Sequence, residues 1–231
     1  LDYGPPGLDE TLATLDALSL AAAGAGQDAV AARRPVVLTS NGVRVAFLGY
    51  AAARWNGSAD VPATDRLAWA VAADVQADVR AAREQADLVV VMLHAGTEYA
   101  AEPSADQVAV AHAAVDAGAD LVVGHHPHVL RPVEVRGEGV IAYSLGNFLA
   151  DMTWMEELRE SLVARCDLRH PARTLELLAA RIGDDFVPRP AQGGVPRAPS
   201  MGIRGLGPEE YRRQTERTEA RQRRTSWLHA L

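Results

Sequence analysis

Two short apolar runs separated by a helical pattern constrain the fold of this chain most strongly. The first run covers residues 88–93 (Leu-Val-Val-Val-Met-Leu), and the second covers residues 121–123 (Leu-Val-Val). Apolar runs of this length predict buried strands, and a run that is apolar throughout is expected where helices cover both faces of a sheet. Residues 104–117 predict a helix, with Ser104 as N-cap and Gly118 as the C-terminal stop. Together these patterns predict a right-handed βαβ unit with parallel strands.

Each of the two predicted strands is followed by histidine. His94 follows the first strand, and Gly124-His125-His126-Pro127-His128 follows the second. The carboxyl ends of neighbouring parallel strands meet at the edge where open α/β sheets bind ligands. Pro127 disfavours the helical region for His126 and favours extended geometry, in which residues two apart face the same way. We therefore predict that His94, His126 and His128 converge at one edge of the sheet.

The histidine cluster supports two interpretations. A single histidine at a strand end is more often a hydrogen-bonded structural residue, although imidazole is also the commonest protein ligand for metals. Three clustered histidines after a glycine, with a fourth at the end of a similar strand, favour a transition-metal site. Cys166 is the one cysteine of the chain, which excludes a disulfide framework and a cysteine-based zinc site.

Composition indicates a globular chain without a membrane or nucleic-acid signature. With 231 residues, 48% of them hydrophobic, the chain is long enough for a substantial core, as one domain or as a domain with a tail. A net charge of −7 without a basic, aromatic-interleaved stripe argues against nucleic acid as a partner. No apolar run approaches the ~20 residues of a membrane span, and the first residues do not form a signal peptide.

Before the βαβ unit, the sequence predicts a helix, a hairpin and a second helix. The apolar stripe of the first helix and its stop residues are Leu8, Leu12, Leu15, Leu18, Gly24 and Gly26. Asn41-Gly42 between apolar runs predicts a hairpin over residues 35–50. The stripe of the second helix is Val71, Val75, Val79 and Ala82. The loop over residues 51–62 carries Arg54, Trp55 and Asn56.

After the histidines, the sequence predicts a hairpin that turns at Gly137-Glu138-Gly139, and then a loop. This loop presents Ser144, Asn147 and Asp151, and it is either an ordinary turn or a close backbone approach to a site. Strands are expected at residues 161–168 and 175–182. Residues 184–207 predict a surface-draped or disordered segment, and residues 208–230 predict a solvated or loosely docked helix. These patterns divide the chain into a domain over 1–185 and a tail over 186–231.

Three motifs carry a resemblance to a known family. They are His94-Ala95-Gly96-Thr97-Glu98-Tyr99, the run from Gly118 to Val129, and Tyr143-Ser144-Leu145-Gly146-Asn147-Phe148. They resemble the bacterial CapA-type capsule synthesis family associated with poly-gamma-glutamate, which is similar to the calcineurin-like metallophosphoesterases. The opening Leu-Asp-Tyr-Gly resembles the end of the family motif Asn-Asn-His-x-x-Asp-Tyr-Gly. The resemblance covers residues 1 to about 185 and leaves out the tail.

The resemblance implies a four-layered α/β/β/α metallophosphoesterase-like sandwich, incomplete at its N-terminus, with a dinuclear metal centre at the sheet edge. His94 matches the lone histidine that follows a central strand in the family, and His126 and His128 match its His-x-His metal ligands. The motif positions beside these ligands, or in contact with substrate, are His125, Glu98 and Asn147. The implied cofactor is a divalent transition metal, with two ions of manganese, iron or zinc in the full-length protein.

The resemblance also implies what this chain lacks. The family motifs Gly-Asp, Asn-Leu-Glu and Asn-Asn-His would lie before Leu1, and they would supply carboxylate, amide and imidazole ligands and the general acid. We therefore expect the chain to be the later part of a longer protein, whose upstream part carries any signal or anchor. With half a metal site, it is expected to bind at most one transition-metal ion weakly and to show negligible phosphoesterase activity.

Two functions stay open. The first is a metal-dependent hydrolase-like protein of capsule or poly-gamma-glutamate biosynthesis, in which two metals activate water on a phosphoester-type or related bond. The second is a noncatalytic cell-surface component of poly-gamma-glutamate assembly or export that keeps a structural metal site. The resemblance implies an extracytoplasmic or cell-surface location. It also implies poly-gamma-glutamate or another envelope polymer, and other capsule synthesis proteins, as partners.

Overall fold

The computed structural model describes residues 3–52, 64–167 and 174–191, which form two compact units. The first unit comprises the residues up to Ala95, Val110–His125 and Arg136–Ile141. The second comprises Gly96–Ala109, His126–Val135 and the residues from Ala142 onward. The chain crosses between the units several times, so each unit combines segments that are distant in the sequence.

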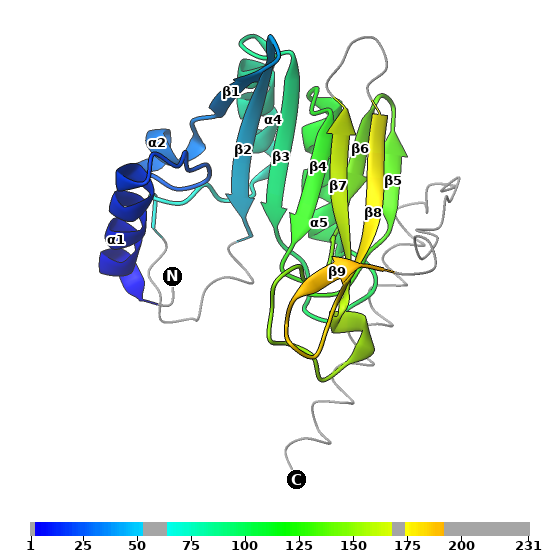
Figure 1. Ribbon diagram of the computed structural model, residues 1–231. Coiled ribbons are helices and arrows are strands. Elements are labelled where there is room, and N and C mark those ends of the chain that lie inside the picture. The colour runs from blue at the N-terminus through cyan, green and yellow to red at the C-terminus, as the bar shows by residue number, and fades with distance from the viewer. Residues whose placement is uncertain (1–2, 53–63, 168–173, 192–231) are drawn as a thin grey trace. The chain divides into compact units, whose positions relative to one another are not determined.

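The strands form a six-stranded sheet and a three-stranded sheet (Figure 1). The order in the larger sheet is β1 (Val36–Ser40), β2 (Val43–Ala51), β3 (Leu88–His94), β4 (Leu121–His125), β6 (Gly139–Ala142) and β5 (Val133–Arg136). The smaller sheet has the order β7 (Glu160–Asp167), β8 (Thr174–Ile182) and β9 (Pro188–Pro190). With helices joining the parallel strands, the chain has the α/β class that the sequence predicts.

Parallel pairing of β2, β3 and β4 forms the centre of the first unit. Helix α4 (Ala72–Arg83) connects β2 to β3, and α5 (Ala105–Asp116) connects β3 to β4. Both strand pairs are parallel, which confirms the predicted βαβ unit. The side chain of Ser104 accepts a hydrogen bond from the Gln107 N–H at 3.2 Å, as expected for the predicted N-cap of α5.

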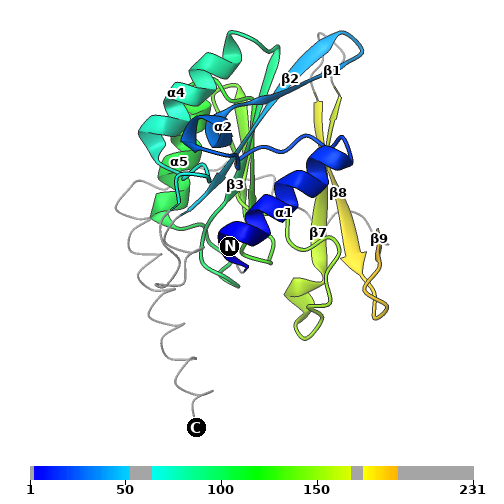
Figure 2. The ribbon, with the colours of Figure 1, turned by 90° about the vertical axis from the view of Figure 1, so that its left-hand side faces the viewer.

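The helices α4 and α5 both lie along one face of these strands (Figure 2). Successive right-handed crossovers that add strands in the same direction bring their helices to the same face. The expectation that helices cover both faces is therefore not met by these two helices. On β3, Val89, Val91 and Leu93 are 0–1% exposed, whereas Val90 and Met92, which point to the opposite face, are only half-buried.

The first helix, α1 (Gly4–Ala17), begins and ends earlier than the leucine stripe predicts. Pro5-Pro6 stands in its first turn, where proline has no N–H bond to lose. The chain leaves the helix before Ser19, whose φ of 55° breaks the helical path. Gly24 therefore does not stop the helix. Instead, it has a φ of 93°, and a Cβ on it would lie 3.0 Å from the carbonyl carbon of Gly49.

Both predicted hairpins are present. Asn41 and Gly42 have φ values of 50° and 81° and connect β1 to β2, as in a type I′ turn. Residues 137–138 connect β5 to β6, and Gly137 has a φ of 56°. Positive φ is accessible to glycine and tolerated by asparagine. Residues that predict the two turns therefore adopt positive φ in them.

A short helix that the sequence did not predict, α2 (Ala29–Arg33), joins a polar cluster on α4. The Arg33 guanidinium donates to both carboxylate oxygens of Asp78 at 2.8 Å. The Tyr50 hydroxyl donates to Asp78 Oδ2 at 2.9 Å. Burial, reinforced by the negative charge of Asp78, raises the pKa of Tyr50 above its ordinary value. The phenol therefore stays protonated and continues to donate to the carboxylate.

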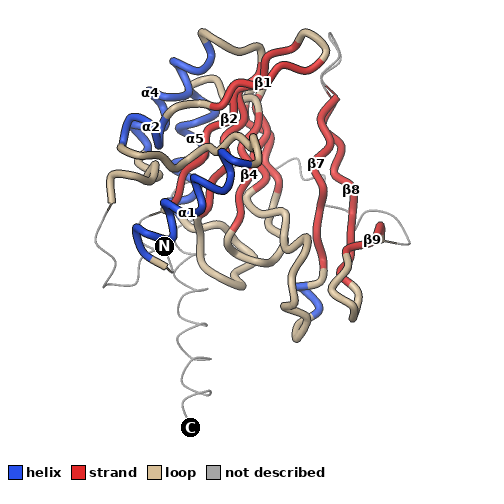
Figure 3. The backbone as a smooth tube through the Cα atoms, turned by 60° about the vertical axis from the view of Figure 1, so that its left-hand side comes forward, coloured by secondary structure: helices blue, strands red, loops and turns tan. Residues whose placement is uncertain are grey.

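Figure 3 traces β7, β8 and β9, which form the smaller sheet. This sheet is antiparallel throughout and belongs to the second unit. The predicted strands at 161–168 and 175–182 are confirmed to within one residue as β7 and β8. The prediction of an irregular segment after Asp184 is wrong for β9, which pairs with β8 through the register Ala180↔Pro190. Proline is accepted there because β9 is an edge strand, where a missing donor costs little.

None of the helices that the structure describes is both long and apolar enough to cross a membrane. Three predictions fall wholly or partly on residues outside the described ranges. These are the loop side chains Arg54, Trp55 and Asn56, the helix over residues 208–230, and the irregular segment beyond residue 191. The domain boundary between residues 185 and 186 stays a prediction.

Candidate functional site

The first unit places His94 beside His125, where β3 and β4 end. The two residues are register partners, and their ring centroids lie 6.3 Å apart with planes inclined by 44°. The Ala95 N–H donates to the His125 carbonyl at 3.1 Å, so parallel pairing continues to the last residue of both strands. His94 is half-buried and His125 is exposed at the strand end.

The second unit holds His126 and His128 in a turn instead of an extended segment. Their φ values are 98° and 64°, so the prediction of extended geometry at His126 is wrong. Pro127 disfavours the right-handed helical region for His126 and favours extended geometry, so the local preference does not account for this positive φ. The ring centroids of His126 and His128 are nevertheless 6.2 Å apart, with planes inclined by 48°. The two imidazoles are therefore neighbours, as predicted, through a different backbone path.

Asn147 fixes the orientation of the His128 ring. The buried Asn147 side chain donates from Nδ2 to the Leu158 carbonyl at 3.1 Å, and its Oδ1 lies 2.8 Å from His128 Nδ1. A carbonyl only accepts, so the amide nitrogen must face Leu158 and the amide oxygen must face His128. Nδ1 therefore carries a proton, and in the neutral form of the ring the lone pair is on Nε2. This is how ligating histidines are oriented in metal sites.

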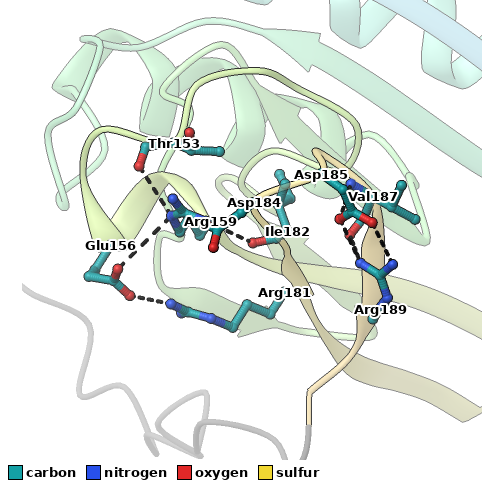
Figure 4. A network of polar contacts seen from close by, with 9 residues as sticks. All are labelled: Thr153, Glu156, Arg159, Arg181, Ile182, Asp184, Asp185, Val187 and Arg189. Atoms are coloured by element: carbon teal, nitrogen blue, oxygen red, sulfur yellow. Dashed lines mark hydrogen bonds and ion pairs between the residues drawn. The ribbon is translucent and has the colours of Figure 1, made fainter.

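A polar network holds the segment that presents the Leu158 carbonyl (Figure 4). The segment contains η1 (Glu156–Leu158). Arg159 donates to the Thr153 carbonyl at 3.1 Å and to Asp184 at 2.8 Å, and Arg181 pairs with Glu156. Asp184 is almost fully exposed, so its ion pair with Arg159 contributes little stability by itself. The network nevertheless ties η1 to the end of β8, and η1 contains the Leu158 carbonyl that binds Asn147.

The loop after β3 brings Tyr99 against His128. The two rings are stacked, with centroids 6.0 Å apart and planes inclined by 28°. Tyr99 has a φ of 60°, and its N–H donates to the Pro127 carbonyl at 2.9 Å. Tyr99, His126 and His128 thus all have positive φ, which is uncommon for residues other than glycine. Strain of this kind, of order 1–3 kcal/mol each, tends to collect at functional sites.

The electrostatic surroundings keep the imidazole of His126 neutral. Burial lowers its pKa, and His128 and Arg131 lower it further, whereas the carboxylate of Glu98 acts in the opposite direction. Burial also raises the pKa of Tyr99, with a smaller contribution from Glu98. At neutral pH the site therefore presents a neutral imidazole at His126, which is the form that binds a metal ion, beside a protonated phenol.

Sequence reasoning missed the buried polar pair that supports this loop, Arg131 and Gln107. Both side chains are at most 4% exposed. Arg131 binds two carbonyls of the segment 96–100 and the Gln107 side chain. Neither residue belongs to a local motif. The sequence signal near them is the glycine at position 96, whose φ in the structure is 113°.

The remaining predicted site residues are placed differently. Ser144 is 1% exposed, and its hydroxyl accepts from the Gly146 N–H at 3.2 Å, so it shapes the turn. Asp151 is exposed. Within residues 3–52, 64–167 and 174–191, no group of three or more His, Cys, Asp or Glu side chains is placed to hold a metal ion. The convergence of His94 with His126 and His128 stays a prediction.

Proteins named for capsule, PGA or polyglutamine synthesis match about two thirds or more of this chain. The PGA biosynthesis protein CapA of Bacillus subtilis is 38% identical over 164 residues, covering 71% of this chain and 43% of its own length. The capsule biosynthesis protein CapA of Bacillus anthracis is 39% identical over 169 residues, covering 70% of this chain and 40% of its own. A probable polyglutamine synthesis accessory protein of Mycobacterium tuberculosis is 34% identical, covering 65% and 43%. The chain thus spans about two fifths of the length of these relatives.

Among solved structures, a candidate 5′-nucleotidase of Staphylococcus aureus, crystallised with alpha-ketoglutarate, matches 93% of this chain and 39% of its own. The sequence identity is 16% and the TM-score is 0.49. The sequence model of the family described as "Bacterial capsule synthesis protein PGA_cap" matches residues 1–152, which include all three motifs from His94 to Phe148. On the strength of that match and of the CapA relatives, the chain belongs to the bacterial capsule synthesis protein family PGA_cap.

Proposed function

We propose that His126 and His128 form part of a metal centre in a hydrolase-like protein of capsule or poly-gamma-glutamate biosynthesis. One observation carries the proposal. The Asn147 amide, itself held by the Leu158 carbonyl, accepts from His128 Nδ1, so that in the neutral form of the ring the lone pair is on Nε2. A buried amide used in this way orients an imidazole for a ligand.

The geometry of the pair suits one transition-metal ion. Two imidazoles on one tetrahedral ion, with metal–nitrogen distances of about 2.0–2.1 Å, have ring centres roughly 5 Å apart. The centroids of His126 and His128 are 6.2 Å apart, so the two rings would have to move about 1 Å closer to share one ion. Imidazole ligands favour manganese, iron or zinc over magnesium or calcium.

Two imidazoles are fewer than the three protein ligands of a catalytic zinc site. We propose that further ligands come from His94 and, in a longer protein, from segments that correspond to the parts of the relatives that this chain does not match. A bound metal pair would activate water and stabilise the oxygens of a phosphoester-type or related bond. The residues of this chain would hold and orient the ion through His126 and His128. Tyr99, stacked on His128, would form a wall of the ligand site.

A noncatalytic role in polymer assembly or export is the alternative. In this role, the metal site would be structural. A cell-surface or other extracytoplasmic location is part of both proposals. So is a partner among poly-gamma-glutamate, another envelope polymer and other capsule synthesis proteins.

Metal titration of single-histidine variants tests the proposal. Calorimetric titration of the 231-residue chain with Zn²⁺ or Mn²⁺ is expected to show one weak site that is lost in His126→Ala and in His128→Ala. His112→Ala, on α5, is the matched control and should bind like the parent chain. Loss of binding in His94→Ala would support convergence of the three histidines. Unchanged binding in both His126→Ala and His128→Ala would refute the metal site, and metal binding by full-length protein without phosphodiester turnover would favour the noncatalytic role.

A further inference from the structure

The guanidinium of Arg131 lies at the centre of a buried hydrogen-bond network behind the histidines. Arg131 is 4% exposed. Its Nε donates to the Ala100 carbonyl at 2.8 Å, and its two terminal nitrogens donate to Gln107 Oε1 at 2.5 Å and to the Thr97 carbonyl at 2.7 Å. Two of these three acceptors belong to the backbone of the segment 96–100. A planar guanidinium that reaches three acceptors at once fixes that backbone in a way that one ammonium group cannot.

Gln107 completes the network from α5. Its side chain is 2% exposed, and its Nε2 donates to the Tyr143 carbonyl at 2.8 Å. Because its Oε1 accepts from Arg131, both ends of the amide are used. Two buried side chains, Arg131 and Gln107, therefore join the segment 96–100, the helix α5 and the Tyr143 backbone. Buried polar networks that are fully satisfied make their surroundings rigid.

Gly96 shows how closely this network approaches the loop. A Cβ on Gly96 would collide with Nη1 of Arg131 and would lie 3.0 Å from Gln107 Oε1. The φ of Gly96 is 113°, so its backbone also favours glycine. Gly118 has nearly the same φ, 111°, but a Cβ there would meet its nearest atom, on Arg83, at an ordinary 3.8 Å. The two glycines thus share the backbone requirement and differ in the space around them.

The loop held by Arg131 carries Tyr99. Tyr99 lies between Thr97 and Ala100 in the sequence, and the carbonyls of both these residues accept hydrogen bonds from Arg131. The Tyr99 N–H donates to the Pro127 carbonyl at 2.9 Å. The loop is therefore fixed from both sides, and the strained φ of 60° at Tyr99 is maintained by these contacts. The ring of Tyr99 is stacked on His128 and is 41% exposed, so part of its surface remains available to a ligand.

We infer that Arg131 is a positioning residue of the His126–His128 site: by holding residues 96–100, it keeps the Tyr99 ring stacked on His128 as a wall against which the ligand of the site binds. The ligand side of this inference rests on the proposed function, with a metal ion and a phosphoester-type group as the ligand class. The positioning side rests on contacts within the second unit alone.

The test compares Gly96→Ala and Arg131→Lys with Gly118→Ala in the full 231-residue chain. The readout is the set of NOEs between the Tyr99 and His128 rings, together with the ring-proton shifts of His128. Both test variants are expected to lose these NOEs, whereas Gly118→Ala should keep them. Circular dichroism and thermal unfolding identify any variant that fails to fold, and Gly96→Ala, as the more local change, then decides the case. Persistence of the NOEs in folded Gly96→Ala and Arg131→Lys would overturn the inference.

Metal titration then tests the ligand side. Loss of a network of charge-assisted hydrogen bonds is expected to weaken Zn²⁺ or Mn²⁺ binding about 10- to 100-fold, in line with the effect of groups that support metal ligands. Unchanged affinity in a variant that has lost the Tyr99–His128 contact would overturn the role of the stacked ring. If the parent chain and longer protein bind no metal, the proposed function fails. The NOE comparison still decides whether Arg131 positions Tyr99, so the two failures are distinguishable.

Discussion

Replacement of Asn147 by alanine separates support of His128 from support of the fold. The change removes the Oδ1 contact with His128 Nδ1 at 2.8 Å and the Nδ2 bond to the Leu158 carbonyl at 3.1 Å. Asn147 is 8% exposed and Leu158 is fully buried, so the Leu158 carbonyl loses its side-chain partner where water has little access. Each lost bond is worth about 1 kcal/mol and an unsatisfied buried group costs about 1–3 kcal/mol. We expect Asn147→Ala to lower the free energy of unfolding by roughly 2–4 kcal/mol.

The effect on the site is expected in a second measurement. Without Oδ1, this hydrogen bond no longer selects which ring nitrogen of His128 carries the proton. Loss of a group that orients a ligating histidine typically weakens metal binding about 10- to 100-fold. Calorimetric titration with Zn²⁺ should therefore show weaker binding or none, and the ¹⁵N shifts of His128 should show a mixture of tautomers instead of Nδ1–H alone.

Asn147→Asp is the matched variant for this pair of measurements. The aspartate keeps an oxygen toward His128 but loses the donor to Leu158, so stability should fall while the Nδ1–H tautomer is retained. The reasoning would be refuted if Asn147→Ala lost stability but kept both the parent affinity for Zn²⁺ and a pure Nδ1–H tautomer. Asn147 would then support the fold alone.

Three further predictions concern the metal content, a buried tyrosine and the core. The 231-residue chain should bind at most one transition-metal ion weakly and show negligible phosphodiester turnover, and tight binding of two ions in calorimetry would contradict this. The pKa of Tyr50 is raised above its ordinary 10.0, so the folded state holds this proton more tightly. That contribution to stability is complete below pH 10 and is lost as the pH rises further. Urea unfolding across this range should show a smaller alkaline loss for Tyr50→Phe, and an identical loss would argue against it. Leu48 is 1% exposed, and Leu48→Ala should lower the free energy of unfolding by about 2–5 kcal/mol; a change well below 1 kcal/mol in denaturant titration would show that the site relaxes fully.

Many of the strands, helix ends and turns were predictable because their signals are local. The apolar run of β3, the N-cap at Ser104 and the turn at Asn41-Gly42 each depend on residues within one or two turns of chain. Hydrophobic period and turn chemistry report such features directly. The parallel βαβ unit followed from their order, because right-handed crossovers leave few topologies. The family motifs placed His126, His128 and Asn147 among the candidates on the same local basis.

Tertiary structure decided how the candidate site is built. The left-handed backbone at Tyr99, His126 and His128 runs against local preference, so only contacts from distant segments can hold it. Those contacts join residues 19 to 34 positions apart, such as His128 with Asn147 and Arg131 with the segment 96–100. A sequence pattern over a few neighbours carries no record of partners at that separation. For that reason the sequence alone identified the histidines. Only the fold determined which nitrogen of His128 donates to Asn147 and that Arg131 holds the segment that carries Tyr99.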